Sequence, residues 1–366
     1  MLALLAAFAT AQIAPREADL PAGGETIRRA VLRRDGQTIP AQILGKKLVF
    51  LADVEKADYT LAEAPAALPD RVLCIDDGQR LTIRVGARQA LQYNYKVVPQ
   101  PDPVFSRSGY IHPLWTPSGS IVTNDSPPNH LHHHGIWSAW TSSMFEGRRS
   151  NFWESKEKQG RVECVKVEET VSGPVFGGFR ARHRFVNLNG PDGEKVALEE
   201  LWDVRIYALE DRFLIDLTST QSCATDQPLV IKEYRYGGVG FRGPADWEGK
   251  SGVEFLTSEG KNRVEGHATR AKWVLAWGKV GDRTASVGFL GHATNFRDPQ
   301  PLRIHPDEPF FNWAVPQGGD FSIEPGKPYS ARYRFVVADA MLDRDTMERA
   351  WTDFNVAAAV RVTFSK

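Results

Sequence analysis

The stretch FRARHRFV, residues 179–186, decides the fold class, because its apolar and polar residues alternate with a period of two. The alternation separates three arginines from the side chains of Phe179, Ala181, His183 and Phe185. Successive side chains of a β-strand point to opposite faces of a sheet, so this pattern predicts a strand with one buried face.

Similar strand patterns precede and follow this stretch. They are RLTIRVG (80–86), RVECVKVEE (161–169), LEELWDVRIYAL (198–209) and RFLIDLTST (212–220). The connecting segments NLNGPDGEK (187–195) and ALED (208–211) have the composition of turns. The sequence therefore predicts an all-β protein built around a large antiparallel β-sandwich.

Composition divides the chain into four parts. Short strand-like runs predict a small β module at residues 25–65, and the Pro- and Ala-rich segment 63–70 reads as a linker to a β-sandwich domain at 70–345. The segment DRDTMERAWTDF (343–354) predicts a helix with Asp345 as its N-cap and Glu348 in a capping box. This helix and the tail that follows it form the C-terminal part of the chain, at 345–366.

The first twelve residues, MLALLAAFATAQ, resemble a secretory signal peptide, which predicts a periplasmic or secreted protein. Lys and Arg number 45 and Asp and Glu number 45, so the balanced charge gives no reason to expect a nucleic-acid partner. No later stretch approaches the roughly 20 apolar residues of a membrane span, which predicts no membrane insertion.

The segment NHLHHHGIW (129–137) holds four of the nine histidines. If it were extended, His130, His132 and His134 would share one side and His133 would point the other way. Three interpretations follow: a polar loop that caps the sheet end, a divalent metal site, or imidazoles that act as general acid and base. A metal site would combine His130 and His132 with His112 or His292.

Three further segments carry polar and aromatic side chains in connecting regions. They are SGYIHPLWTPSGS (108–120) with Tyr110 and His112, IKEYRYGGVGFRG (231–243) with Glu233 and Arg235, and GHATNFRDPQPLRIHP (291–306) with His292, Asn295 and Arg297. In the second segment, alternation would place Glu233 and Arg235 on one face and the tyrosines on the other. Polar side chains bind sugar hydroxyls and aromatic rings cover their C–H faces, so this mixture favours a carbohydrate ligand.

Three ordered segments resemble the bacterial family named methane oxygenase PmoA, found in bacteria that degrade complex polysaccharides. They are GYIHPLWTPSGSIVTNDSPPNHLHHHGIW (109–137), EYRYGGVGFRG (233–243) and PFFNWAVPQGGDFSIEPGKPYSARYRFVVAD (309–339), within a resemblance over about residues 25–345. The family loop Asp-His-Pro-His-His-Arg-Gly is matched at His130, His132, His133 and Gly135, with departures at Asn129, Leu131 and His134. The family is similar in fold to the galactose mutarotase-like superfamily, whose members use His with Glu or Asp on sugars.

Together these features predict an exported, carbohydrate-processing enzyme of the epimerase, lyase or hydrolase type. The predicted catalytic residues are His132, His133 and Glu233. The predicted substrate-binding residues are Tyr110, His112, His130, Arg235, His292, Asn295 and Arg297. The alternatives are a non-catalytic carbohydrate-binding protein and a metal-dependent enzyme; no organic cofactor is predicted, and a divalent metal ion remains open.

Overall fold

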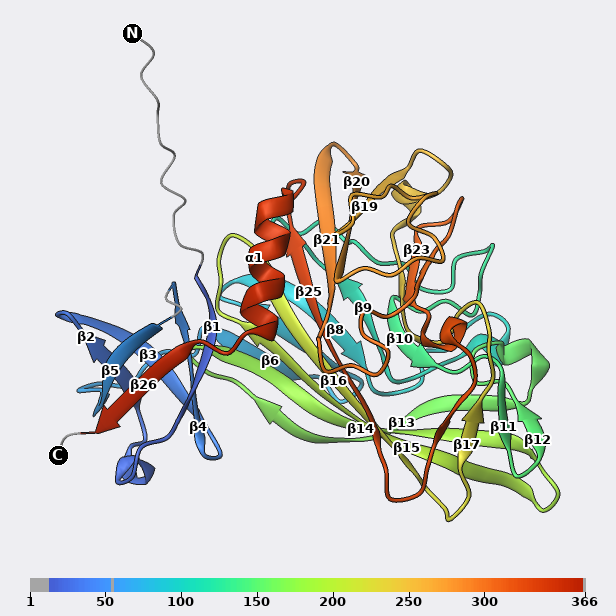
Figure 1. The fold of residues 1–366 in the computed structure, drawn as a ribbon, viewed down its shortest axis with the longest axis horizontal. Helices are drawn as coiled ribbons and strands as arrows, with labels where there is room; N and C mark the ends of the chain where they lie inside the picture. Colours follow the sequence, from blue (N-terminus) through green and yellow to red (C-terminus); the bar gives the residue numbers. More distant parts are fainter. Residues whose placement is uncertain (1–12, 54–55, 365–366) are drawn as a thin grey trace, which may run out of the picture.

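The computed structural model describes residues 13–53 and 56–364, so the predicted signal peptide lies outside the described residues. These residues form strands β1 to β26, one α-helix and five short 3-10 helices (Figure 1). Nearly all strand pairs are antiparallel, which confirms the predicted all-β, mostly antiparallel class. Within the described ranges, no helix is long and apolar enough to cross a bilayer.

The longest strands form an eight-stranded sheet, which we call the long-strand sheet. Its order is β13-β14-β15-β16-β25-β21-β20-β19. The strands are β13 (Gly160–Val171), β14 (Phe176–Gly190), β15 (Gly193–Tyr207), β16 (Phe213–Cys223), β19 (Val253–Thr257), β20 (Trp273–Val280), β21 (Arg283–Gly291) and β25 (Tyr329–Ala338). In β14 the predicted inward face is confirmed, because Phe179, Ala181, His183 and Phe185 are buried and the arginines between them are half-buried.

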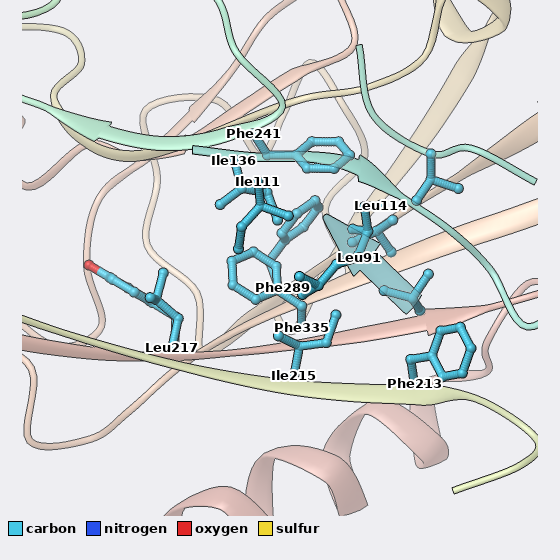
Figure 2. Packing of buried hydrophobic residues seen from close by; sticks show 14 of the residues in the cluster. Leu91, Ile111, Leu114, Ile136, Phe213, Ile215, Leu217, Phe241, Phe289 and Phe335 are labelled. Atoms are coloured by element: carbon cyan, nitrogen blue, oxygen red, sulfur yellow. The ribbon is translucent and has the colours of Figure 1, made fainter. Parts of the chain in front are cut away.

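A second eight-stranded sheet, the short-strand sheet, has the order β22-β23-β18-β10-β9-β8-β7-β6. Its strands are β6 (Val72–Asp76), β7 (Arg80–Val85), β8 (Arg88–Asn94), β9 (Tyr110–Leu114), β10 (Ile136–Ala139), β18 (Gly238–Arg242), β22 (Leu302–Ile304) and β23 (Phe310–Trp313). One face of this sheet packs on the long-strand sheet around the main hydrophobic core, which draws side chains from both (Figure 2). Ile111 and Ile136 come from one sheet, and Ile215 and Phe335 from the other.

Two smaller sheets complete the structure. A four-stranded sheet, in the order β12-β11-β17-β24, comprises β11 (Ser143–Phe145), β12 (Arg148–Ser150), β17 (Leu229–Ile231) and β24 (Phe321–Ile323). A six-stranded sheet, in the order β1-β4-β3-β2-β5-β26, comprises β1 (Ala14–Asp19), β2 (Ala30–Arg34), β3 (Gln37–Leu44), β4 (Lys47–Ala52), β5 (Lys56–Glu63) and β26 (Ala359–Phe364). The tail expected after the helix is thus a strand, which pairs in parallel with β5 (Figure 1).

Helix α1 (Arg344–Asn355) confirms the predicted C-terminal helix, but its N-cap differs from the prediction. Its cap is Asp343, whose side chain accepts a hydrogen bond of 2.7 Å from the backbone N–H of Thr346. Asp345 lies inside the first turn instead. The buried residues Met347, Ala350 and Phe354 pack on the face of the long-strand sheet that points away from the main core.

Replacing the cap residue Asp343 with alanine is expected to lower the free energy of unfolding by about 1 kcal/mol, because one helical N–H loses its partner. The matched control Asp345→Ala removes a carboxylate from the same turn without removing the cap, and about 0.5 kcal/mol is expected. Urea unfolding measures both variants. A larger loss for Asp345→Ala would show that the cap is misassigned.

A polar cluster is sealed between the two eight-stranded sheets. The Glu200 carboxylate lies 3.0 Å from Nδ1 of His183 and accepts hydrogen bonds from Ser219 (2.5 Å) and Gln221 (2.9 Å). Nε2 of His183 in turn lies 2.5 Å from the hydroxyl of Tyr93. Glu200 and His183 are both 1% exposed, so this network is a structural element of the core.

Candidate functional site

The histidine loop, residues 127–134, forms two consecutive turns and is not extended. The N–H of His130 donates to the carbonyl of Pro127, and the N–H of His133 donates to the carbonyl of His130, each at 2.9 Å. The turns gather the rings of His130, His132 and His133, with centroids 4.6 to 5.7 Å apart. His133 therefore lies beside His130 and His132 and does not point away from them, as it would in an extended segment.

The sheet register explains why this loop meets residues from distant strands. Trp137 on β10 lies opposite Gly240 on β18, Gly240 opposite Asn312 on β23, and Asn312 opposite Arg303 on β22. Directly opposed residues share a face, and the neighbouring row, which includes Ile136, belongs to the main core. The candidate site therefore lies on the face of the short-strand sheet that points away from that core.

His133 lies within a stack of aromatic rings. Its centroid is 4.7 Å from that of His130 and 4.8 Å from that of Phe310, with 16° between the planes in both pairs. Trp137 lies 5.1 Å away. The side chain of His133 is only 4% exposed, so a direct catalytic role is not supported, and we assign it a positioning role.

The fully buried guanidinium of Arg242 contacts the ring of His133 and helps to orient it. Nη1 of Arg242 lies 3.5 Å from Nδ1 of His133, which acts as the acceptor because arginine only donates. Nη2 of Arg242 forms ion pairs with Glu248 and, at 2.8 Å, with Glu308, and it donates to Asn129 at 3.0 Å. Burial and the nearby charges lower the pKa of His133 well below its usual range, so its ring is neutral.

His132 and Glu154 form the partly exposed edge of the cluster. Nε2 of His132 lies 3.3 Å from Oε1 of Glu154, and their side chains are 16% and 27% exposed. Burial, followed by the charges of neighbouring groups, lowers the pKa of His132 to about 3. Burial raises the pKa of Glu154, although the hydroxyl of Tyr236, which donates to it at 3.1 Å, opposes this change. The two groups are therefore in contact while their pKa values are displaced in opposite directions.

The predicted residues Tyr110 and His112 are held inside the protein beside this loop. The hydroxyl of fully buried Tyr110 donates to Asp125 at 2.7 Å, and His134 lies 2.7 Å from the other oxygen of the same carboxylate. Nδ1 of His112 lies 2.9 Å from the hydroxyl of Thr123. The prediction that Tyr110 binds substrate is not supported, because its hydroxyl is sealed against Asp125.

The predicted residues Glu233 and Arg297 meet at Asp320 and not at the histidines. The N–H of Glu233 donates to Oδ1 of Asp320 at 2.6 Å, while Arg297 donates to the Asp320 carbonyl at 3.1 Å. Arg297 also donates to the carbonyls of Val315 and Gly319, so the N–H groups of its guanidinium are used in hydrogen bonds to the backbone. The segment 232–237 leaves the sheet, so the predicted alternation fails there, and the carboxylate next to His132 is Glu154 instead of Glu233.

His292 and Asn295 are also separated from the histidine loop by their contacts. His292 lies between Thr294 and Arg332 and packs against Phe354 of α1, while Asn295 exchanges two hydrogen bonds with the backbone of Arg332. These contacts hold the end of β21 and do not extend the site. In the described ranges, no group of three or more His, Cys, Asp or Glu side chains has a geometry suited to a metal ion.

Of the predicted set, the structure brings together His130, His132 and His133, with Arg235 stacked over the neighbouring ring of Tyr236. The sequence reasoning missed Glu154, Tyr236, Arg242, Glu248 and Glu308. The sequence does contain a signal for Arg242, because this charged residue follows the apolar run GVGF in β18. A buried charge in such a strand requires oppositely charged partners nearby.

A cavity of about 690 Å³ lies elsewhere in the molecule. It is bounded by the six-stranded sheet, the turn after β15 and helix α1, with Leu51, Leu209 and Arg212 among its lining residues. None of the predicted site residues lines it. We place the candidate site at the histidines because titratable groups with displaced pKa values converge there, and cavity volume alone indicates no chemistry.

The low pKa of His132 predicts acid sensitivity. In the unfolded chain an imidazole takes up a proton near pH 6.5, whereas folded His132 stays neutral down to about pH 3. The unfolded chain therefore binds more protons in this window, and stability falls as the pH decreases through it. His132→Gln should make the fall between pH 6 and 4 shallower by about 1.4 kcal/mol per pH unit, as measured by urea unfolding. Identical slopes would contradict the burial of a neutral imidazole.

The fold and site define an all-β protein with a histidine, carboxylate and arginine cluster on the outer face of one sheet. A family of unknown function, DUF6807, matches residues 80–352, and the chain belongs to this family. The match to DUF6807 does not confirm the resemblance to the family named methane oxygenase PmoA. No curated protein matches the chain.

Solved structures share the fold only distantly. A galactose mutarotase related enzyme from Lactobacillus acidophilus has 9% identity and a TM-score of 0.33, over 74% of this chain and 100% of that one. A GH36 alpha-galactosidase from Geobacillus stearothermophilus has 9% identity and a TM-score of 0.34, over 74% and 40%. A heparan sulfate lyase mutant from Pedobacter heparinus has 10% identity and a TM-score of 0.37, over 77% of this chain and only 38% of the lyase.

Proposed function

We propose that the protein is an exported enzyme that performs acid/base chemistry on a sugar, with His132 and Glu154 as the proton-transfer pair. The observation that carries the proposal is the 3.3 Å contact between a neutral imidazole and a carboxylate whose pKa burial raises. Groups whose environments displace their pKa values in this way are typical of acid/base assignments. Both groups remain partly exposed, so a ligand can reach them.

The geometry assigns a role to each group. Nε2 of His132 faces Glu154, so an N–H at that position leaves Nδ1 with a free lone pair that can accept a proton. The hydroxyl of Tyr236 donates to Oε1 of Glu154 and holds this carboxylate near the His132 ring. Proton transfer at a sugar carbon or ring oxygen would lead to epimerisation, elimination or hydrolysis. His133, held by Arg242, supports the stack that positions His130.

Aromatic and polar side chains next to the pair support a carbohydrate ligand. Tyr234 and Tyr236 pack edge to face, with centroids 5.0 Å apart, and Arg235 lies over both rings. Partly exposed aromatic rings suit the C–H face of a sugar.

We propose in addition that the paired eight-stranded sheets are a galactose mutarotase-like super-sandwich and that residues 1–12 direct export.

Incubation of the full chain with a panel of neutral and acidic sugars, keto-sugars and short oligosaccharides tests this function. NMR would detect a new anomer, epimer, unsaturated sugar or cleaved bond. We expect at least one such product with wild type and its loss with Glu154→Gln. Chemical-shift changes that show binding without any new species would contradict the enzymatic proposal and favour the carbohydrate-binding alternative.

A further inference from the structure

Two arginines beside the proposed site lack acidic partners. Arg303 on β22 is half-buried, and its one recorded polar contact is Nη1 to Nε2 of His267 at 3.2 Å. Because arginine can only donate, His267 is the acceptor and is neutral there. Arg235 is exposed and lies over the rings of Tyr234 and Tyr236. Among the described residues, no carboxylate forms an ion pair with either guanidinium.

Gln317 joins the two segments that carry these arginines, because its Nε2 donates to the carbonyls of Arg235 (2.9 Å) and of Leu302 (3.3 Å), the residue before Arg303. The two positive charges therefore act on each other. Burial and then the charge of Arg235 lower the pKa of Arg303. Elsewhere in the site a buried arginine is neutralised: Arg242 has both Glu248 and Glu308. A half-buried cation beside a like charge is unfavourable, and the structure gives Arg303 only a neutral imidazole. An oxoanion placed between the guanidiniums would remove this imbalance.

Both arginines border the His132–Glu154 pair. Tyr236 donates to Glu154 at 3.1 Å, and its ring lies under Arg235. His305, one residue beyond β22, lies 6.0 Å from the ring of His130, and the charge of Arg303 contributes to lowering its pKa, after burial. Glu154 contacts His132 and Tyr236 and forms no ion pair with Arg235, although the charge of Arg235 partly offsets the rise in the pKa of Glu154.

We infer that Arg303 and Arg235 bind an oxoanion group of a sugar substrate, such as a carboxylate, a sulfate ester or a phosphate ester, beside the His132–Glu154 pair. A guanidinium presents paired N–H donors that match the oxygens of such a group. This inference deepens the proposed function and rests on it for the sugar part of the ligand, whereas binding of the anion can be measured without turnover.

The test measures binding of sugar sets that share one ring and differ in one substituent. Glucose, glucuronate, glucose sulfate and glucose phosphate form one set, with equivalent sets built on galactose and mannose. Isothermal titration calorimetry would compare wild type with Arg303→Met, with Arg235→Met, and with Arg361→Met, an exposed arginine on β26 of the six-stranded sheet. Circular dichroism would verify folding, and the exposed Arg235 carries the test if Arg303→Met does not fold.

We expect one anionic class to bind wild type at least about 10-fold more tightly than its neutral parent, with an advantage that falls as salt increases. Arg303→Met should remove this advantage, Arg235→Met should reduce it, and Arg361→Met should retain it. Equal binding of neutral and anionic members, no binding of any anionic member, or an advantage that survives both site variants would overturn the inference.

The outcomes for the two proposals are separable. Turnover of neutral sugars without any anionic preference would remove only the oxoanion inference. Binding of an anionic sugar that depends on Arg303, together with no product in any member of the panel, would remove only the proposed acid/base activity. The class that binds, whether carboxylate, sulfate or phosphate, identifies the source of the oxoanion.

Discussion

Replacing His132 with glutamine is expected to lower kcat by roughly 100- to 10,000-fold on whichever sugar the wild-type protein converts. Glutamine has a similar polarity, but it has no imidazole nitrogen that can accept a proton from the substrate and release it again during the reaction. In this variant Glu154 would no longer have an imidazole base 3.3 Å away. Initial rates measured by NMR or by a coupled assay, with KM determined separately, would distinguish lost chemistry from lost binding.

His292→Gln is the matched control for this variant, because His292 is also an imidazole with a low pKa, about 4, lowered mainly by burial, but it contacts Thr294 and Arg332. We expect its kcat to remain within about twofold of wild type, because the contacts of His292 lie outside the histidine loop. Wild-type activity should also stay level between pH 7 and 6, because His132 takes up no proton in that range. Equal losses for the two variants would remove His132 from the proton-transfer role.

Glu200→Ala is expected to have the largest effect on stability, about 3 to 5 kcal/mol in the free energy of unfolding. The substitution leaves His183, Ser219 and Gln221 without their shared acceptor in the closed space between the sheets. Donors that lose their partner away from water retain the full cost of desolvation. Urea unfolding, followed by far-ultraviolet circular dichroism, measures this loss.

Glu199→Ala provides the control from the same strand and the opposite face. Glu199 forms a partly exposed ion pair with Arg182 at 3.0 Å, and the loss of such a pair costs about 1 kcal/mol or less. The difference between these neighbouring positions isolates the effect of burial. Unfolding free energies that agree for Glu199→Ala and Glu200→Ala would show that the sealed network contributes nothing specific.

The strands were predictable because their signal is local. In β14 and β16, apolar residues such as Phe179, Ala181 and Phe185 alternate with polar ones, so the sequence alone identifies the buried face, and helix α1 is marked by its apolar stripe. The cap of that helix was placed at Asp345 and not at Asp343, because two aspartates stand two residues apart and only the backbone path selects between them.

The site was less predictable because its contacts are not local. Two turn hydrogen bonds reverse the expected directions of His133 and His134, and a count of alternating positions cannot detect them. Glu154 reaches His132 from the segment after β12, and Arg242 reaches His133 from β18. Glu233 does not lie next to His132, because residues 232–237 leave the sheet and the N–H of Glu233 donates to Asp320.

Strand β26 has a consequence for the order in which the chain folds during synthesis. The hydroxyl of Thr363 donates to the carbonyl of Tyr59 across 304 positions, so one edge of β5 has no partner until residues 359–364 leave the ribosome. An unpaired strand edge attracts other chains. Ribosome-bound nascent chains that lack these residues should therefore bind chaperones more strongly than chains that expose them, because pairing with β26 covers the open edge of β5.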